Sequence, residues 1–308
     1  MLQYFLKKRL KKHDSNNNLK VESLVLGHLL GLKALNCESS GVGNDKPHNI
    51  VVSLTSYNKR IYDVYLCIES LYQQSLRADA IVLWLSLRDF PDRRLPEILR
   101  KQQARGLQIH FVENDFGPYM KYMYAFDMFP NSLIVTVDDD VLYPSDTIDL
   151  LYQSYLRAPS HIHCHRAHKI LLNGKGELKP YESWRSYGLN SEPSPFLFAT
   201  GMAGVLYPPD SLHEDAFNSK KFMELCPAAD DVWLKAMSLL RGKYVTRVPD
   251  YRYWRERFLT IQGSQIQQLK EINLRGTGGN DCKIKRVFSE YQLLDYLQER
   301  NQPVLSPH

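Results

Sequence analysis

The chain has 308 residues, of which 44% are hydrophobic and 24% charged. This composition is typical of a globular protein and excludes disorder as the main state. The formal net charge of +5 comes from 39 basic and 34 acidic residues, and the first acidic residue is Asp14. Five basic residues precede it: Lys7, Lys8, Arg9, Lys11 and Lys12. The excess charge is therefore local to the N-terminus, and a nucleic-acid-binding face spread over the protein is not expected.

The cysteines indicate the compartment. The chain has five of them, widely spaced and without a C-x-x-C pair, at positions 37, 67, 164, 226 and 282. An odd number in this arrangement argues against a disulfide framework and a zinc ribbon, so we expect a cytoplasmic protein. The opening "MLQYFLKKRLKKH" lacks the order of a signal peptide. The best apolar window, "SLVLGHLLGLKAL", has 13 residues, fewer than the roughly 20 that span a bilayer.

Apolar patterning predicts the elements in chain order. Residues 1–36 indicate two helical pieces, one basic and amphipathic and one apolar, and residues 37–49 form a linker. Apolar strand-like runs then alternate with segments of helical spacing. The runs are "IVVSLT", "AIVLWLS", "LQIHFVE" and "LIVTV", and the helical segments are "VYLCIESLYQQSL", "LPEILRKQQARG" and "YMKYMYAFDMF". Such alternation predicts right-handed βαβ units and a mainly parallel sheet flanked by helices.

Three adjacent aspartates, Asp138, Asp139 and Asp140, directly follow the apolar run 133–137. Ligands of open α/β sheets bind at the carboxyl ends of the strands, where this triplet is expected. Neighbouring carboxylates repel unless a cation or hydrogen-bond donors compensate. Extended geometry would point Asp138 and Asp140 to one side. A hard cation, Mg²⁺ or Mn²⁺, held by one or two carboxylates and substrate phosphates fits this pattern. The alternative is an acidic turn that caps a helix near Ser145.

Several ordered segments carry a family resemblance. "IVTVDDDVLYP" resembles the D-x-D segment of glycosyltransferases with the GT-A fold. "VVSLTSYNKRI" followed by "SLYQQSLRADAIVLWLS" is similar to the opening of bacterial family-2-like sugar transferases. "DFGPYMKYMYAF", "FATGMAGVLYPP" and "CPAADDVW" follow in the order such enzymes show, and the similarity covers roughly residues 49–240.

The resemblance implies a Rossmann-like GT-A domain over residues 49–250, between an N-terminal extension (1–48) and a closing C-terminal segment (251–308). It implies a nucleotide-diphospho-sugar donor, UDP-linked in our prediction, with Mn²⁺ or Mg²⁺ on the diphosphate and inversion at the anomeric carbon. By position Asp140 is the principal metal ligand, and Asp138 completes the metal cluster and the donor site. Asp139 faces the ribose or the metal. The nucleobase and phosphate positions fall on Thr55, Ser56, Tyr57 and Lys121.

One departure concerns the nucleobase. Related sequences often carry an acidic residue at the end of the second strand, where this chain has Ser86; Asp89 is the substitute that we expect from the following loop.

A second acidic pair, Asp230 and Asp231, begins a segment of helical spacing. Aspartate is a good N-cap, so capping is one interpretation of the pair. The resemblance implies another, in which the second acid is the general base that deprotonates the acceptor hydroxyl. By position this catalytic role falls to Asp231, beside Asp230.

Other motifs have open alternatives. The glycines of "ATGMAGVLYPP" allow close backbone approach beneath a donor sugar or a tight turn in the core. Trp184 and Tyr187 are candidates for stacking on an acceptor sugar or for packing. In "SHIHCHRAHK", a metal site is one interpretation and a polar cleft facing the acceptor is the one we favour; its histidines are His161, His163, His165 and His168.

The chain ends are less informative. In the C-terminal region Asn280, Asp281 and Lys283 are candidates for a donor contact, but a surface loop before a last helix, "SEYQLLDYLQER", is the favoured interpretation. The basic N-terminus could lie on an anionic membrane surface, at the inner face of the cell membrane, or form a solvated helix or an oligomer contact.

The predicted function is transfer of a sugar to a glycan or lipid-linked glycan acceptor in the synthesis of a capsule or lipopolysaccharide. The alternative is nucleotidyl transfer on a related α/β fold. That class would usually show a glycine-rich basic loop after the first strand, and "SLTSYNKRIYD" has no glycine.

Overall fold

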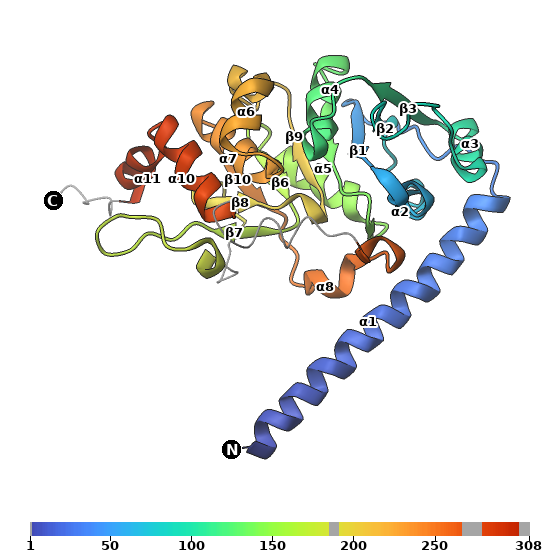
Figure 1. Cartoon of the computed structure of the whole chain (residues 1–308), viewed down its shortest axis with the longest axis horizontal. Coiled ribbons are helices and arrows are strands. Elements are labelled where there is room, and N and C mark those ends of the chain that lie inside the picture. Colours follow the sequence, from blue (N-terminus) through green and yellow to red (C-terminus); the bar gives the residue numbers. More distant parts are fainter. Residues whose placement is uncertain (1, 185–190, 267–278, 302–308) are drawn as a thin grey trace.

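A seven-stranded sheet with strand order β10-β6-β9-β4-β1-β2-β3 forms the centre of the computed structural model (Figure 1). The structure describes residues 2–184, 191–266 and 279–301, with the backbone alone for 2–9 and 11. The strands of the sheet are β1 (Ile50–Thr55), β2 (Ala80–Ser86), β3 (Leu107–Val112), β4 (Leu133–Thr136), β6 (Ile162–Cys164), β9 (Val205–Tyr207) and β10 (Val245–Arg247).

Most neighbouring strands are parallel. The pairs β1–β2, β2–β3, β1–β4 and β10–β6 are parallel, whereas β9 runs antiparallel to β4 and β6. Two short antiparallel pairs lie outside the main sheet: β5 (Val141–Leu142) with β11 (Leu259–Thr260), and β7 (Ala167–Lys169) with β8 (Leu197–Ala199). The predicted mixed, mainly parallel sheet is therefore confirmed.

Helices cover both faces of this sheet, as Figure 1 shows. Those after the N-terminal helix are α2 (Val64–Tyr72), α3 (Glu97–Ala104), α4 (Met120–Met128), α5 (Thr147–Arg157), α6 (Ser219–Leu225), α7 (Asp230–Leu240), α8 (Trp254–Arg257), α10 (Asn280–Glu290) and α11 (Leu293–Asn301). In β1, Ile50 and Val52 belong to the core that contains α2 and α5, while Val51 packs with Met120 of α4. This alternation explains why every residue of the run is apolar or small, because both faces are buried.

The strand order reverses direction at β1, and this reversal determines where a ligand is expected to bind. The chain adds β2 and β3 on one side of β1 and then returns to place β4 on the other side. Ligands of such sheets bind outside the carboxyl ends of the strands at this reversal. The segments that follow β1 and β4 therefore meet where a ligand is expected.

The N-terminal region differs from prediction, because residues Leu2–Asn36 form one continuous helix, α1, and not two pieces. Its polar middle contains neither glycine nor proline, so nothing local breaks the helix. The later turns lie on the body, with Leu30 and Ala34 buried and Ser23 Oγ donating to the Thr260 carbonyl at 2.7 Å. The earlier turns stand away from it (Figure 1). No helix in the described ranges is long and apolar enough to cross a membrane.

The C-terminal prediction also needs correction. The expected last helix over residues 289–300 is interrupted, since α10 ends at Glu290 and α11 begins at Leu293. Gln292 adopts a left-handed φ of 52° at the break, a conformation that an α-helix cannot continue through. Of the glycines of "LRGTGG", Gly279 is the N-cap of α10, and the other two, Gly276 and Gly278, lie outside the described residues.

Candidate active site

The aspartate triplet lies in a turn between β4 and β5, beyond the last residue of β4. The expected strand-like alternation is therefore wrong. Asp139 and Asp140 both face Arg60, at 2.6 Å and 3.1 Å, while Asp138 Oδ1 lies 2.8 Å from Lys121 Nζ. The capping alternative is also wrong, because α5 begins at Thr147 with Asp146 at its N-cap.

Asp139 is an internal anchor of this turn. It is buried, and its second oxygen accepts a 2.6 Å hydrogen bond from Ser56 Oγ. Burial raises the pKa of Asp139, although Arg60 and Ser56 act against that rise. Arg60 comes from the 3₁₀ turn Asn58–Tyr62 after β1, so it joins the ends of β1 and β4. The sequence interpretation missed Arg60, which has no local signal beyond its position shortly after a strand.

Lys121 joins the two acidic clusters. It lies on α4, is 5% exposed, and its Nζ contacts Asp138 at 2.8 Å and Asp230 Oδ2 at 2.9 Å. Burial alone would lower the pKa of Lys121, but these carboxylates hold it well above its usual value. Two acidic segments that are far apart in sequence thus meet at one ammonium group.

Gly201 makes the close approach of Asp231 possible. Its amide N–H donates to Asp231 Oδ1 at 3.0 Å. A Cβ at this position would lie 3.2 Å from Asp231 Oδ1 and 3.2 Å from Lys121 Nζ, which is closer than nearly all such contacts. Of the two interpretations of "ATGMAG", the structure therefore supports a close backbone approach at the site.

The second acidic pair begins α7 but does not cap it. Ala229 occupies the N-cap position, so the capping interpretation is wrong. Burial raises the pKa of Asp230. Burial and the adjacent Asp230 raise the pKa of Asp231 to about 8. A partly buried carboxylate with a pKa near neutrality has the properties of a general base.

The segment after β1 supplies polar groups beside the triplet. Thr55 Oγ1 donates to the Trp84 carbonyl at 2.9 Å, and the Arg60 guanidinium lies over the Tyr57 ring at 5.2 Å. Burial raises the pKa of Tyr57, and Asp89 is among the nearby carboxylates that add to the rise. Asp89 therefore faces the end of β1 from the neighbouring loop, where we expected a substitute for the missing acid.

The donor atoms fit a hard divalent cation that arrives with a phosphorylated substrate. The side chains of Asp138 and Asp140 are 34% and 18% exposed, the most accessible of the triplet. No group of three potential ligands gathers within the described ranges. Mg²⁺ and Mn²⁺ often take one or two carboxylates and complete their shell with phosphate and water, so the set fits them without an all-protein cage.

The histidine motif does not line a polar cleft. His163 and His165 are buried, with Nδ1 of His163 2.8 Å from Ser154 Oγ and Nε2 of His165 2.9 Å from the Thr147 carbonyl. Burial lowers the pKa of both to about 4. His161 stacks on Tyr244. The favoured interpretation of this motif is therefore wrong, because the three rings hold β6 in the core.

Two further candidate regions have internal roles. Trp184 is buried and donates to the Lys179 carbonyl at 2.8 Å, so it packs and cannot stack on an acceptor. Tyr187 lies outside the described residues. On α10, Asp281 Oδ1 accepts from the Tyr181 amide at 2.7 Å and Lys283 is buried. Asp281 and Lys283 thus belong to a helix packed on α7, not to a surface loop.

No protein-family model matches the chain, and no curated protein matches it. Among solved structures, S. aureus TarS 1-349 in complex with UDP aligns over 67% of this chain and 59% of its own, with 14% identity and a TM-score of 0.44. The chain thus spans less than two thirds of that structure.

Two other solved structures align at similar levels. A Pyrobaculum calidifontis mannosyltransferase with GDP-Man and Mn²⁺ covers 92% of this chain and 80% of its own, at 14% identity and a TM-score of 0.41. The T. maritima inositol-1-phosphate CTP transferase aligns over 67% of this chain and 86% of its own, with 12% identity and a TM-score of 0.38. At these identities and TM-scores the likenesses assign no fold family and no residue roles, so both rest on the sheet and the site geometry described above.

Proposed function

We propose that the protein is an inverting glycosyltransferase that moves a sugar from a nucleotide-diphospho-sugar to a glycan acceptor. The observation that carries this proposal is the meeting of Asp138 and the Asp230–Asp231 pair around Lys121, at the reversal point of a mainly parallel sheet. One cluster suits a diphosphate with its cation, and the other suits a hydroxyl nucleophile.

The donor side is the edge formed by the ends of β1 and β4. Thr55, Ser56 and Tyr57 would hold the nucleobase and ribose of a UDP-sugar, next to Asp138 and Asp140. These two carboxylates would hold Mg²⁺ or Mn²⁺, which supplies positive charge for the leaving diphosphate. Arg60 fixes the turn that presents them, through its 2.6 Å and 3.1 Å contacts with Asp139 and Asp140.

The acceptor side is Asp231. Its carboxylate would accept the proton of the acceptor hydroxyl as that oxygen bonds to the anomeric carbon and the bond to the diphosphate breaks. The Gly201 amide holds Asp231 Oδ1 at 3.0 Å and so fixes the direction of the base. Attack from the face opposite the diphosphate inverts the anomeric centre, and no covalent intermediate with the protein is needed.

The proposed setting is cytoplasmic synthesis of a capsule or lipopolysaccharide, with a lipid-linked glycan acceptor. Its support is α1, which exposes an apolar face and carries the basic run at its N-terminal end. The residues of this face, the outer face of α1, are Val21, Leu24, Val25, Leu29, Leu32 and Leu35. A helix with these two features suits an anionic membrane surface.

Calorimetric titration of UDP, GDP and CDP, each with Mn²⁺ or with EDTA, tests the donor site. We expect one nucleotide to bind in a metal-dependent way and Asp138→Asn to weaken it at least tenfold. Asp92→Asn, whose side chain is 73% exposed, is the control and should bind as the wild type does. A panel of sugar nucleotides with radiolabelled sugar then tests transfer. Absence of nucleotide binding in every condition would reject the donor site, and release of pyrophosphate from CTP with a sugar phosphate would indicate nucleotidyl transfer instead.

A further inference from the structure

A lysine amine is buried directly behind the proposed base. Lys235 lies one turn after Asp231 on α7 and is 3% exposed. Among the residues that the structure describes, none forms a hydrogen bond with its Nζ. Burial lowers the pKa of Lys235 to about 7, against an opposing effect of Cys164. A buried ammonium without a partner is costly, so the uncharged amine is a substantial form at neutral pH.

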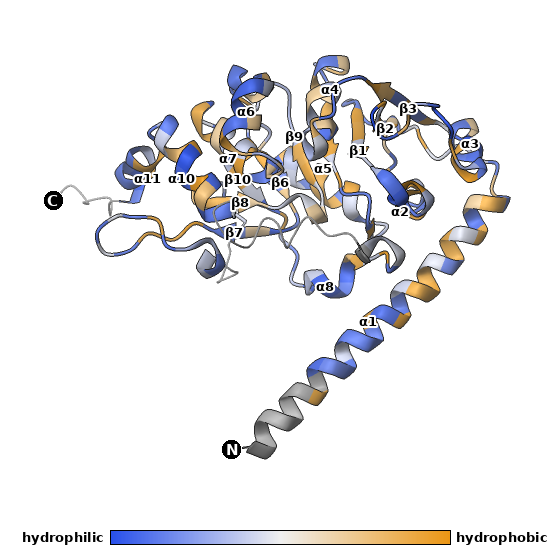
Figure 2. Ribbon diagram, in the orientation of Figure 1, coloured by the Kyte–Doolittle hydropathy of each residue, from blue (hydrophilic) through white to orange (hydrophobic). Residues whose placement is uncertain are grey.

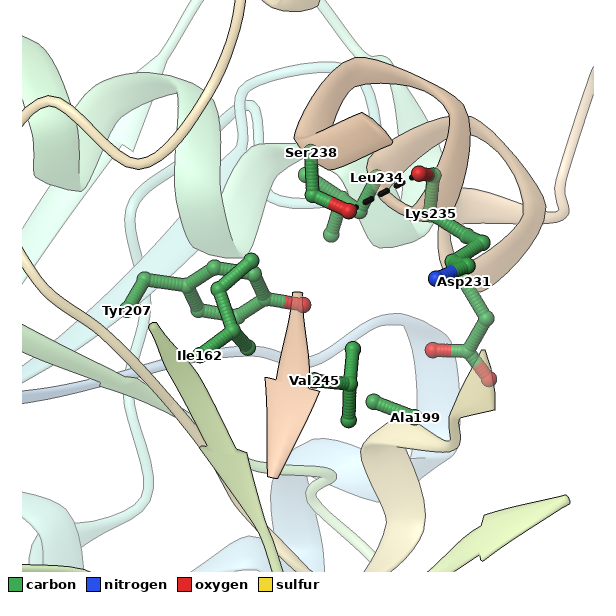
Figure 3. Close-up of a pocket in the computed structure, with 8 residues that line it drawn as sticks. All are labelled: Ile162, Ala199, Tyr207, Asp231, Leu234, Lys235, Ser238 and Val245. Atoms are coloured by element: carbon green, nitrogen blue, oxygen red, sulfur yellow. Dashed lines mark hydrogen bonds between the residues drawn. The ribbon is translucent and has the colours of Figure 1, made fainter. Parts of the chain in front are cut away.

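The amine and the base share a small cavity. Asp231, Lys235 and Ser238 of α7 line it together with Tyr207 of β9 and apolar side chains of β6, β8 and β10. Figure 3 shows the Lys235 amine beside Asp231, with the Tyr207 ring facing the same space. The cavity has room for about one water molecule, which could bridge the two polar groups.

The charged groups around this cavity come from several elements. Those that act on Asp231 are Asp230 of α7, Lys121 of α4 and Asp138 of the β4–β5 turn. Cys164 of β6 faces both Asp231 and Lys235, and Arg166 and Arg247 act on the same thiol. Burial raises the pKa of Tyr207 well above its usual value, and the neighbouring aspartates add to that rise. Tyr207 and Cys164 therefore stay uncharged near neutrality, which leaves Lys235 as the group in the cavity that can take up a proton there.

We propose that Lys235 is the proton acceptor behind Asp231 and takes the proton that Asp231 removes from the acceptor hydroxyl. This inference rests on the proposed function. As the new glycosidic bond forms, the proton moves from the hydroxyl to the Asp231 carboxylate. It then moves through the cavity to the amine, which yields a carboxylate and an ammonium. The bond to the diphosphate takes its electron pair with it, so charge and protons balance.

The physical advantage is restoration of the base. A protonated Asp231 is uncharged and cannot accept a second proton, whereas transfer to Lys235 returns it to the carboxylate. The pKa values of about 8 for Asp231 and about 7 for Lys235 by themselves favour the proton on Asp231 about tenfold, and the attraction between the resulting ammonium and carboxylate in a site of low polarity offsets this preference. In this scheme Lys235 does not touch the substrate. It acts through Asp231 and is therefore a positioning residue.

Lys235→Met tests the proposal through the pH profile of kcat. Without the amine we expect the acid side of the profile to move to higher pH by about one unit, since the proton that the pair shares can then rest only on Asp231. At pH 7 kcat should fall about tenfold, and the two enzymes should converge above about pH 9. Ser238 lines the same cavity, so Ser238→Ala is the matched control. We expect its pH profile of kcat to be unshifted. A uniform loss at every pH in Lys235→Met would show a structural role and overturn the proposal.

Carbon-13 NMR of the Asp231 carboxyl tests the pair without substrate, with Asp231→Asn to assign the signal. We expect a two-step titration in the wild type, because interacting groups share their protons. Lys235→Met should lose the step that the amine contributes, keep any step that comes from the adjacent Asp230, and show a higher midpoint; Lys235→Gln serves if the methionine variant does not fold. A single step in the wild type would overturn the proposal. If the wild-type carboxyl titrates in two steps but the protein transfers no sugar, the proposed function is rejected, whereas the proton exchange between Asp231 and Lys235 is supported.

Discussion

At the scale of single residues, the described part of the site is defined by carboxylates gathered around two basic side chains. Asp139 and Asp140 form ion pairs with the largely buried Arg60, and Asp138 and Asp230 form them with the buried Lys121. Burial, followed by the charge of the adjacent Asp230, raises the pKa of Asp231 to about 8. A cation bound near the triplet and a proton on Asp231 would each offset part of this negative charge.

Asp231→Asn tests the base at this scale. Because only the carboxylate can accept a proton, activity of the wild type should rise with pH through about 8, the pKa of Asp231, and fall below it. Above about pH 8 the variant should lose roughly 10²- to 10⁴-fold in kcat, and this loss should shrink at lower pH, with nucleotide binding unchanged. Rate measurements from pH 6 to 9.5, with calorimetry of the nucleotide, check this. Full activity in the variant would exclude Asp231 as the base.

The same group has a stability consequence of known sign. The folded-state pKa of Asp231, about 8, lies above its unfolded value, so the folded protein holds a proton that the unfolded chain has released. Its contribution to stability is therefore complete below the unfolded pKa and is lost as pH rises through the folded pKa. Urea unfolding of Asp231→Asn should show a smaller loss of stability between about pH 4 and pH 8, which confirms that the variant is folded when its activity is judged.

At the scale of elements, an ion-pair cluster holds the segment after β10 against the start of α5. Arg257 is 7% exposed and contacts both Asp146 and Asp250, the latter at 2.7 Å. The segment continues into β11, which pairs with β5, and the Ile261 amide donates to the Asp140 carbonyl at 2.8 Å. The cluster therefore fixes a strand that borders the aspartate triplet.

Arg257→Met tests this cluster. Removing the largely buried Arg257 leaves Asp146 and Asp250 with only the more exposed Arg252 of the two arginines that contact them here, so we expect a loss of about 1–3 kcal/mol in the free energy of unfolding. Hydrogen exchange of the 259–261 amides should quicken. The control is Arg241→Met, an exposed pair with Asp210, expected to cost about 0–1 kcal/mol. Equal effects in both variants would contradict a special role for the cluster.

The cluster also predicts an acid limit. Although burial opposes it, Arg252 and Arg257 hold the pKa of Asp146 below its usual value, and Arg252 does the same for Asp250. Carboxylates with depressed pKa values contribute stability that is present above the unfolded pKa and lost as pH falls through the folded one. The difference between wild type and Arg257→Met should therefore shrink below about pH 4.

At the scale of the whole molecule, α1 has apolar residues on two sides. Leu30 and Ala34 face the body, whereas the outer face of α1 is 46–60% exposed. Figure 2 shows hydrophobic residues along the half of α1 nearest α2 and α3, beyond a hydrophilic middle. Packing on the body explains only the first side, so a second apolar surface needs another explanation.

Sedimentation with lipid vesicles tests membrane contact. We expect binding to vesicles with 30% anionic lipid, weakened at high salt because the N-terminal lysines contribute. The double variant Leu24→Ser/Leu32→Ser should bind at least tenfold more weakly. Leu156→Ser, at an exposed leucine of α5, is the control. Equal vesicle binding by the double variant would reject the outer face of α1 as the contact, and concentration-dependent dimerisation without vesicle binding would indicate a second copy there.

The sequence by itself determined the sheet, because unbroken apolar runs such as Ile50–Thr55 suit strands buried on both faces and alternate with helical spacing. It also placed Asp138–Asp140 just after a strand and Asp230–Asp231 at a helix start, since both are local features. Only the tertiary structure decided how they are partnered. Arg60, Lys121 and Gly201 meet these acids through strand order and helix packing, which local patterns do not encode. The same reason applies to the buried histidines and to Lys235, whose chemistry depends on what surrounds them in three dimensions.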